Sequence, residues 1–221
     1  MSIDTIVFDM DGVIVDTEEI WNEVRHDFAV NHGGTWKREL DQPKVMGANS
    51  QQWAVSLREN NGVDLPVEEI LRGIIDGLKE RFGRELPVIE GAPEAIARLG
   101  RRYRLGVASS SPLEFVEYAL EMAGVRERFA VVLSSDEVES GKPLPYVYLE
   151  ACRRLDTAPN RAVAVEDSAN GIKAAHAAGM AVIAIPNPGF PPSPESLALA
   201  DAQLRSVAEL TETFVDGLGR A

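Results

Sequence analysis

The stretch Ile6-Val7-Phe8-Asp9-Met10-Asp11-Gly12-Val13 decides how the rest of the chain is interpreted. An apolar run typical of a buried strand ends in two aspartates one residue apart, and a glycine follows. Two carboxylates this close repel each other unless a cation or a proton intervenes. The pattern therefore predicts that Asp9 and Asp11 lie at the carboxyl edge of a parallel sheet, where open α/β folds bind ligands. An aspartate-rich turn after a strand is the alternative that this motif alone leaves open.

Short apolar runs alternate with helical patterns along most of the chain, which favours a doubly wound, Rossmann-like α/β fold built on a parallel sheet. The runs are rich in β-branched residues, as expected of strands buried on both faces. The predicted strands cover residues 5–9, 105–109, 130–134, 162–166 and 181–185. The predicted helices between and after them cover residues 92–101, 113–123, 145–154 and 168–178.

One long segment breaks this alternation directly after the first strand. It contains no convincing strand and is typical of amphipathic helices, predicted at residues 17–31, 50–60 and 67–82. We therefore expect a core domain formed by residues 1–14 and 87–221. Residues 15–86 are expected to form an inserted α-helical cap domain above the sheet edge that carries the two aspartates.

Composition limits the partners of the chain. Its 221 residues carry a net charge of −13 without any basic cluster, which argues against binding to nucleic acid. No apolar run approaches the roughly 20 residues of a membrane span, and no basic-then-apolar leader begins the sequence. The single cysteine, Cys152, excludes an intramolecular disulfide and a cysteine-based zinc site. We expect a cytoplasmic monomer that has neither a nucleic-acid nor a membrane partner.

Three serines, Ser109, Ser110 and Ser111, follow the second predicted strand and precede a helix. A hydroxyl beside the free N–H groups of a helix N-terminus suits an oxyanion or a phosphate. A capped turn is the alternative, with Ser111 as N-cap and Pro112 as the first helical residue.

Two further strand ends carry charged residues. Lys142 stands between Gly141 and Pro143 in a rigid loop and could pair with a phosphate or a carboxylate, although loop lysines are more often solvated. Glu166 and Asp167 follow the fourth predicted strand, and carboxylate oxygens suit Mg²⁺. Ser168 is expected to cap the next helix.

The order of these four motifs resembles that of the haloacid dehalogenase-like superfamily, and the resemblance covers essentially the whole chain. The motifs are Asp9-Met10-Asp11-Gly12-Val13, Ser109, Gly141-Lys142-Pro143 and Glu166-Asp167-Ser168. Within the superfamily the chain is most similar to the β-phosphoglucomutase-like branch, whose members carry a helical cap after the first motif.

The resemblance implies a role for each motif. Asp9 would be the nucleophile that forms an aspartyl-phosphate, and Asp11 the general acid and then the base. Ser109 and Lys142 would hold the phosphoryl oxygens. Two further groups of residues are implied. The Mg²⁺ ligands would come from Asp9, Asp11 (through its backbone carbonyl), Asp167 and the nearby Glu166, and the substrate would contact Thr17, Trp21, Ser110 and Lys142.

These roles predict a Mg²⁺-dependent phosphomonoester hydrolase that acts on a small phosphorylated metabolite. A phosphomutase is the alternative, but the cap residues by which mutases of this branch grip a second phosphate, a His and an Arg, are replaced. Trp21 stands at the spacing of the His after Thr17, and Ser50 at that of the Arg after Gly47. A mutase would need other cap cations, of which the candidates are Lys44, Arg58 and Lys79. A non-catalytic homologue would be expected to lack one of the two aspartates.

Overall fold

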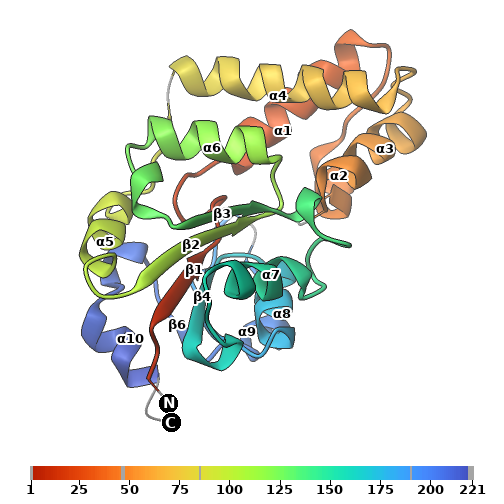
Figure 1. Cartoon of the computed structure of the whole chain (residues 1–221). Helices are drawn as coiled ribbons and strands as arrows, with labels where there is room; N and C mark the ends of the chain where they lie inside the picture. Colours follow the sequence, from red (N-terminus) through yellow and green to blue (C-terminus); the bar gives the residue numbers. More distant parts are fainter. Residues whose placement is uncertain (1, 46–47, 85, 190, 219–221) are drawn as a thin grey trace.

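A six-stranded, entirely parallel sheet with the strand order β3-β2-β1-β4-β5-β6 forms the centre of the molecule (Figure 1). The structure is a computed structural model and describes residues 2–45, 48–84, 86–189 and 191–218. The strands are β1 (Thr5–Phe8), β2 (Arg104–Ser109), β3 (Val131–Ser134), β4 (Ala162–Glu166), β5 (Ala181–Ala184) and β6 (Ala202–Gln203). The five predicted strands are confirmed to within one residue at each end. The two-residue β6 was not predicted, because it is too short to leave an apolar run.

Side chains alternate between the two faces of the sheet, and helices cover both faces. In β1, Ile6 and Phe8 pack into one apolar cluster and Val7 into another. The first cluster includes side chains of α5 (Ala92–Leu99), α6 (Leu113–Met122) and α10 (Glu212–Leu218). The second includes side chains of α7 (Tyr146–Arg154), α8 (Ala169–Ala177) and α9 (Pro194–Leu197). This arrangement confirms the doubly wound α/β fold.

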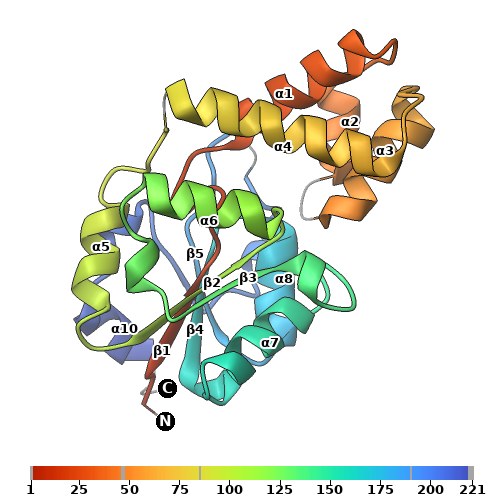
Figure 2. The ribbon, with the colours of Figure 1, turned by 45° about the horizontal axis from the view of Figure 1, so that its top comes forward.

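Four helices between β1 and α5 lie beyond the carboxyl edge of the sheet (Figure 2). They are α1 (Glu18–Asn31), α2 (Arg38–Val45), α3 (Ser50–Asn61) and α4 (Val67–Arg84). α4 shows why this segment is helical, because its buried residues Val67, Ile70, Ile74, Leu78 and Phe82 recur every three or four positions. α2 was not predicted, because the sequence Arg-Glu-Leu-Asp-Gln-Pro-Lys-Val has few apolar residues and contains a proline.

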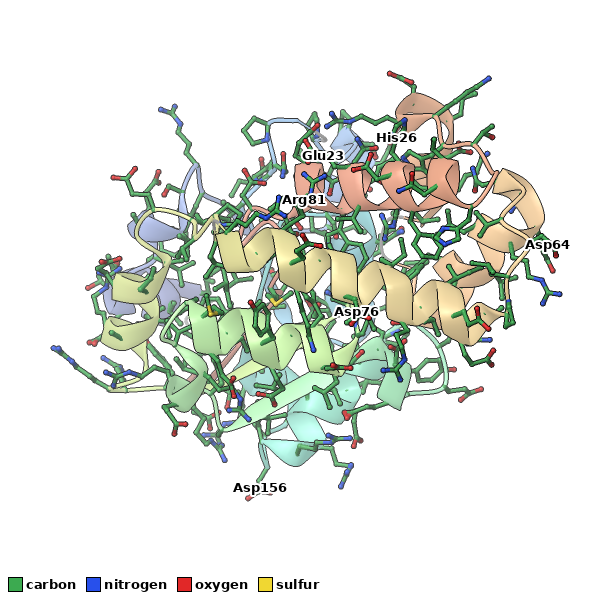
Figure 3. The ribbon with its side chains drawn as sticks, turned by 90° about the horizontal axis from the view of Figure 1, so that it is seen from above. Glu23, His26, Asp64, Asp76, Arg81 and Asp156 are labelled. Carbon is green, nitrogen blue, oxygen red and sulfur yellow. The ribbon has the colours of Figure 1, made fainter. Side chains whose placement is uncertain are left out.

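The helical layer is connected to the sheet by two adjacent backbone segments. Val15 forms a bridge with Val88, Asp16 N–H donates to the Pro87 carbonyl at 2.8 Å, and Ile89 N–H donates to the Ile14 carbonyl at 3.0 Å. Within the layer, Arg81 of α4 donates to Glu23 and Asp27 of α1 at 2.6 and 2.9 Å; Figure 3 labels Arg81 and Glu23 on their adjacent helices.

Apolar packing continues from the sheet into the helical layer. Phe115 of α6 makes edge-to-face contacts with Trp21 of α1 and Phe82 of α4, with ring centroids 5.7 and 4.9 Å apart. Trp21, Trp36 and Trp53 are all buried. None of the helices in the described ranges is long and apolar enough to cross a bilayer.

A polar contact joins the two layers at the N-terminus of α3. Ser50 N–H and its hydroxyl donate to the two carboxylate oxygens of Asp136, at 2.8 and 2.5 Å. Asp136 belongs to the 3-10 turn Ser135–Glu137 after β3. The carboxylate therefore accepts a hydrogen bond from a free N–H group at a helix N-terminus, where negative charge is favourable.

We expect Asp136→Ala to lower the free energy of unfolding by about 1 kcal/mol, because it removes both hydrogen bonds. Urea denaturation measures this effect, with Glu139→Ala, an exposed residue three positions along the same loop, as the matched control. Equal stability of the two variants would show that the contact between Ser50 and Asp136 contributes nothing.

Candidate active site

A pocket of about 90 Å³ lies between the carboxyl edge of the sheet and helices α1, α2 and α3. Seven of the nine predicted site residues line it: Asp9, Asp11, Thr17, Trp21, Ser110, Lys142 and Asp167. The other two, Ser109 and Glu166, lie behind the pocket surface, where they contact residues that line it. The four motifs therefore meet at one place, as their positions at strand ends predicted.

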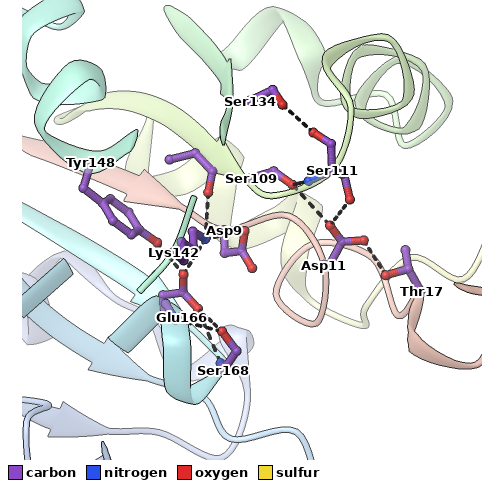
Figure 4. A network of polar contacts seen from close by, with 12 residues as sticks. Asp9, Asp11, Thr17, Ser109, Ser111, Ser134, Lys142, Tyr148, Glu166 and Ser168 are labelled. Carbon is purple, nitrogen blue, oxygen red and sulfur yellow. Dashed lines mark hydrogen bonds and ion pairs between the residues drawn. The ribbon is translucent and has the colours of Figure 1, made fainter. Parts of the chain in front are cut away.

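Lys142 forms the centre of the site, and its side chain is buried (Figure 4). Its Nζ donates to Asp9 Oδ1 at 3.0 Å, to Glu166 Oε1 at 2.6 Å and to the Ala108 carbonyl at 3.0 Å. Burial alone would lower the pKa of Lys142, but the carboxylates of Asp9 and Glu166 raise it above its usual range. The side chain is therefore a fixed ammonium ion, not a solvated loop lysine.

Glu166 is completely buried and holds Lys142 in place. Its Oε1 also accepts from the Tyr148 hydroxyl at 2.5 Å, and its Oε2 accepts from the Ser168 hydroxyl at 3.1 Å. A Cβ on Gly171 of α8 would lie 1.8 Å from Glu166 Oε1, so only glycine leaves room for this carboxylate. Ser168 caps α8 as predicted, since its hydroxyl accepts from Gly171 N–H at 3.1 Å.

Asp9, Glu166 and Asp167 form an acidic cluster in which one carboxylate oxygen of each lies within 4.8 Å of the others. Burial raises the pKa of Asp9 to about 8, although Lys142 opposes the shift, and burial also raises the pKa of Asp167 well above its usual range. Once all three are ionised, the buried carboxylates outnumber the single ammonium ion and leave an excess of negative charge. That excess, and an all-oxygen donor set, fit a divalent cation such as Mg²⁺.

Gly12 allows Asp167 to approach the first motif. Its φ of +79° is in the left-handed region, and a Cβ there would lie 2.0 Å from Asp167 Oδ2. The glycine of the opening motif is thus explained by both its backbone conformation and its close contact with the acidic cluster.

The Asp11 carboxylate points away from the acidic cluster and accepts four hydrogen bonds (Figure 4). Thr17 and Trp21 Nε1 donate to Oδ1, the latter at 3.2 Å. Ser109 and Ser111 donate to Oδ2 at 3.2 and 2.8 Å. These donors fix the Asp11 carboxylate at the wall of the pocket, outside the acidic cluster of Asp9, Glu166 and Asp167.

The structure corrects one prediction and adds residues that the sequence did not reveal. Ser111 does not cap α6: the N-cap is Pro112, and the Ser111 hydroxyl binds Asp11 instead. Tyr148 was missed because it lies inside an ordinary helical pattern and nothing in the sequence relates it to Glu166. On the cap side, Glu18, Arg25 and Gln42 also line the pocket. They were missed because Glu18 and Arg25 belong to a predicted helix with many charged residues and Gln42 to a helix that was not predicted.

The three cap cations named as candidates for a second phosphate site lie elsewhere. Lys44 donates to Asp41 at 2.9 Å, Lys79 pairs with Glu114 of α6, and Arg58 lines a different surface depression. Ser50 binds Asp136, and Gly47, used to align Ser50 with the mutase pattern, lies outside the described residues.

Comparisons with known proteins identify the family of the chain and relatives with the same fold. Residues 6–185 match the model of the haloacid dehalogenase-like hydrolase family. Hexitol phosphatase B of Escherichia coli K12 is 32% identical over 216 residues, covering 93% of each chain. A variant of CbbY from Rhodobacter sphaeroides, solved in complex with xylulose 1,5-bisphosphate, is 32% identical with a TM-score of 0.87, covering 97% of this chain and 99% of that one. β-Phosphoglucomutase from Clostridium difficile, 17% identical with a TM-score of 0.83 and covering 98% of this chain and 97% of that one, shares the fold.

We expect saturating Mg²⁺ to raise the Tm by about 5 °C or more, because a cation that binds only the folded acidic cluster would stabilise the native state. The rise should be larger at about pH 8.5 than at about pH 6. The pKa of Asp9 is raised from 3.8 to about 8 in the folded protein, so at the lower pH a proton must leave before the cation binds. Differential scanning fluorimetry measures both effects.

Asp167→Asn is the matched variant for this experiment, because it removes one carboxylate of the cluster and keeps its size. It should lose most of the Mg²⁺-dependent rise. A rise as large as in the wild type, or no rise in the wild type, would contradict the assignment of the cluster to a cation.

Proposed function

The chain belongs to the family of haloacid dehalogenase-like hydrolases, and on that premise we propose that it is a Mg²⁺-dependent phosphatase that acts on a small phosphorylated carbohydrate through an aspartyl-phosphate at Asp9. One observation carries the proposal. The buried Asp9 carboxylate opens onto the pocket beside a fixed ammonium ion, and the Asp11 carboxylate stands at the same wall. This combination provides a nucleophile, an electrostatic partner and a proton carrier at one place.

We propose that Asp9, Asp167 and the Asp11 backbone carbonyl hold the Mg²⁺. The bound cation would neutralise charge between the nucleophile and the phosphoryl group. Glu166 contributes negative charge to the cluster, while its hydrogen bonds to Lys142 and Tyr148 make it a positioning residue as well.

In the first step, an Asp9 oxygen forms a bond to phosphorus while the bond from phosphorus to the ester oxygen breaks. Asp11 gives a proton to the departing oxygen. In the second step, water attacks the same phosphorus, Asp11 takes a proton from that water, and Asp9 leaves as a free carboxylate. We propose that Lys142 and Ser109 hold the phosphoryl oxygens after exchanging a present hydrogen bond, since the Lys142 ammonium now donates three bonds and the Ser109 hydroxyl donates to Asp11. Ser110 lines the pocket beside them.

We propose that residues 15–86 act as the cap domain and residues 1–14 and 87–221 as the core domain. Residues of α1, α2 and α3 line one side of the pocket, and the cap meets the core through Phe115 and through the Ser50–Asp136 contact. A cap that excludes bulk water protects the aspartyl-phosphate until the second step.

The substrate class rests on the relatives and on the pocket. One relative is a hexitol phosphatase, and another was solved with a sugar bisphosphate. The pocket combines aromatic walls with polar groups, which fits a sugar or hexitol phosphate.

A phosphomutase is the second candidate, because Arg25 places a cation on the cap side of the pocket. We expect net hydrolysis. ³¹P NMR of the enzyme with Mg²⁺, β-glucose 1-phosphate and a catalytic amount of glucose 1,6-bisphosphate distinguishes the two, with sorbitol 6-phosphate in a parallel sample. Inorganic phosphate should accumulate. Faster formation of glucose 6-phosphate would identify a mutase, and no turnover of any phosphate ester would favour a non-catalytic homologue.

Asp11→Asn is expected to lower kcat on alkyl phosphates by about 10²–10⁴-fold, because proton transfer to the leaving oxygen is lost. The loss should be smaller on p-nitrophenyl phosphate, whose leaving group scarcely needs a proton. Steady-state phosphate release from both substrates measures the difference. Equal losses on the two would mean that Asp11 is not the acid.

A further inference from the structure

Arg25 of α1 is a buried cation whose hydrogen bonding is incomplete. The residue is only 6% exposed, and it lines the same pocket as Asp9 and Asp11. Its Nη1 donates to Gln42 Oε1 at 3.2 Å, whereas its Nε is buried without a hydrogen-bond partner. Within the part of the chain that the structure describes, no carboxylate forms an ion pair with this guanidinium group. A buried charge of this kind is costly unless a ligand completes its hydrogen bonds.

Aromatic rings, not a counter-ion, hold this guanidinium group in position. Its carbon lies 4.4 Å from the ring centroid of Trp21, 5.6 Å from that of Trp53 and 5.9 Å from that of Trp36. The rings restrict the side chain and attract its charge, but they satisfy no strong hydrogen bond. Burial lowers the pKa of Arg25 only to about 10, so the group is charged at neutral pH.

An acceptor lies beside this donor. Gln42 Nε2 donates to Glu18 Oε1 at 2.5 Å, so Gln42 connects Arg25 to Glu18. Glu18 lines the pocket as well. The cap side of the pocket thus offers both an N–H donor and a carboxylate acceptor to whatever part of the substrate lies away from the phosphate.

We propose that Arg25 and Glu18 recognise neutral hydroxyl groups at the end of the substrate away from the phosphate, so that the enzyme selects polyhydroxy monophosphates over bisphosphates. This inference rests on the proposed phosphatase function. A hydroxyl both donates and accepts, so it satisfies both groups at once. The oxygens of a second phosphate act only as hydrogen-bond acceptors. The second phosphate would meet one cation and the carboxylates of Glu18 and Asp11, which repel it.

Three substrates that share a six-carbon chain test the proposal: sorbitol 6-phosphate, n-hexyl phosphate and sorbitol 1,6-bisphosphate. The measured quantity is the ratio of kcat/KM for sorbitol 6-phosphate to that for each of the others. Wild-type enzyme should prefer sorbitol 6-phosphate to both. Arg25→Met should lower the ratio of kcat/KM for sorbitol 6-phosphate to that for n-hexyl phosphate by about tenfold or more, because hydrogen bonds from a charged donor are lost.

Two further variants make the result specific. Arg25→Lys keeps the positive charge among the tryptophan rings but loses the planar guanidinium group. Its ratio of kcat/KM for sorbitol 6-phosphate to that for n-hexyl phosphate should therefore fall between those of wild type and Arg25→Met. It also keeps the test valid if Arg25→Met fails to fold, which thermal unfolding would reveal. Arg58→Met is the matched control, an exposed arginine of α3 outside this pocket, and should keep the wild-type ratio.

Four outcomes would overturn the inference. If both Arg25 variants keep a kcat/KM ratio of sorbitol 6-phosphate to n-hexyl phosphate within about twofold of wild type, the Arg25 side chain does not recognise the substrate hydroxyls. A wild-type preference for the bisphosphate that Arg25→Met abolishes would make Arg25 a second phosphate site. Equal hydrolysis of n-hexyl phosphate and sorbitol 6-phosphate by wild-type enzyme would refute the inference alone and leave the phosphatase function intact. No phosphate release from any of the three would refute the phosphatase function and the inference with it.

Discussion

The buried ammonium ion of Lys142, bridging Asp9 and Glu166, is the interaction on which the site depends. It lets two carboxylates approach at the carboxyl edge of the sheet, where neither is well hydrated. With Asp167 nearby, it balances only part of the negative charge, so a cation can still be attracted. The same residue therefore holds the nucleophile in place, favours metal binding and supplies positive charge for a phosphoryl group. Removing it would leave an uncompensated buried charge, which costs roughly 3–5 kcal/mol in other proteins.

The parallel sheet explains why four short motifs far apart in the sequence could be predicted to meet. Strand order places β2 and β4 on either side of β1, so Asp9, Ser109 and Glu166 emerge at one edge, at the point where the strand order reverses. Strand positions followed from apolar runs, and the chemistry followed from the residue types at their ends. The details of contact did not follow: Ser111 could be a helix cap or a partner of Asp11, and only the backbone path into α6 decides between them.

The cap side was less predictable for a physical reason. A charged residue in an amphipathic helix is normally exposed, so no sequence pattern indicated that Arg25 would be buried among tryptophans contributed by α1, α3 and the segment before α2. Gln42 belongs to a helix with little apolar periodicity, and Tyr148 reaches Glu166 only because α7 packs against the sheet. Such contacts depend on tertiary packing. The chemistry of the site lies in the core motifs, whereas the groups that distinguish substrates lie in the cap.

The proposed mechanism requires a covalent bond between phosphorus and Asp9. Sodium borohydride added during turnover reduces an aspartyl-phosphate to homoserine, and mass spectrometry of the peptide that contains residue 9 locates the change. We predict homoserine at position 9 in wild-type enzyme with Mg²⁺ and sorbitol 6-phosphate, and none without substrate or in Asp9→Asn. Phosphate release without any modification, or homoserine at Asp11 or Asp167 instead, would contradict the assignment of Asp9 as the nucleophile.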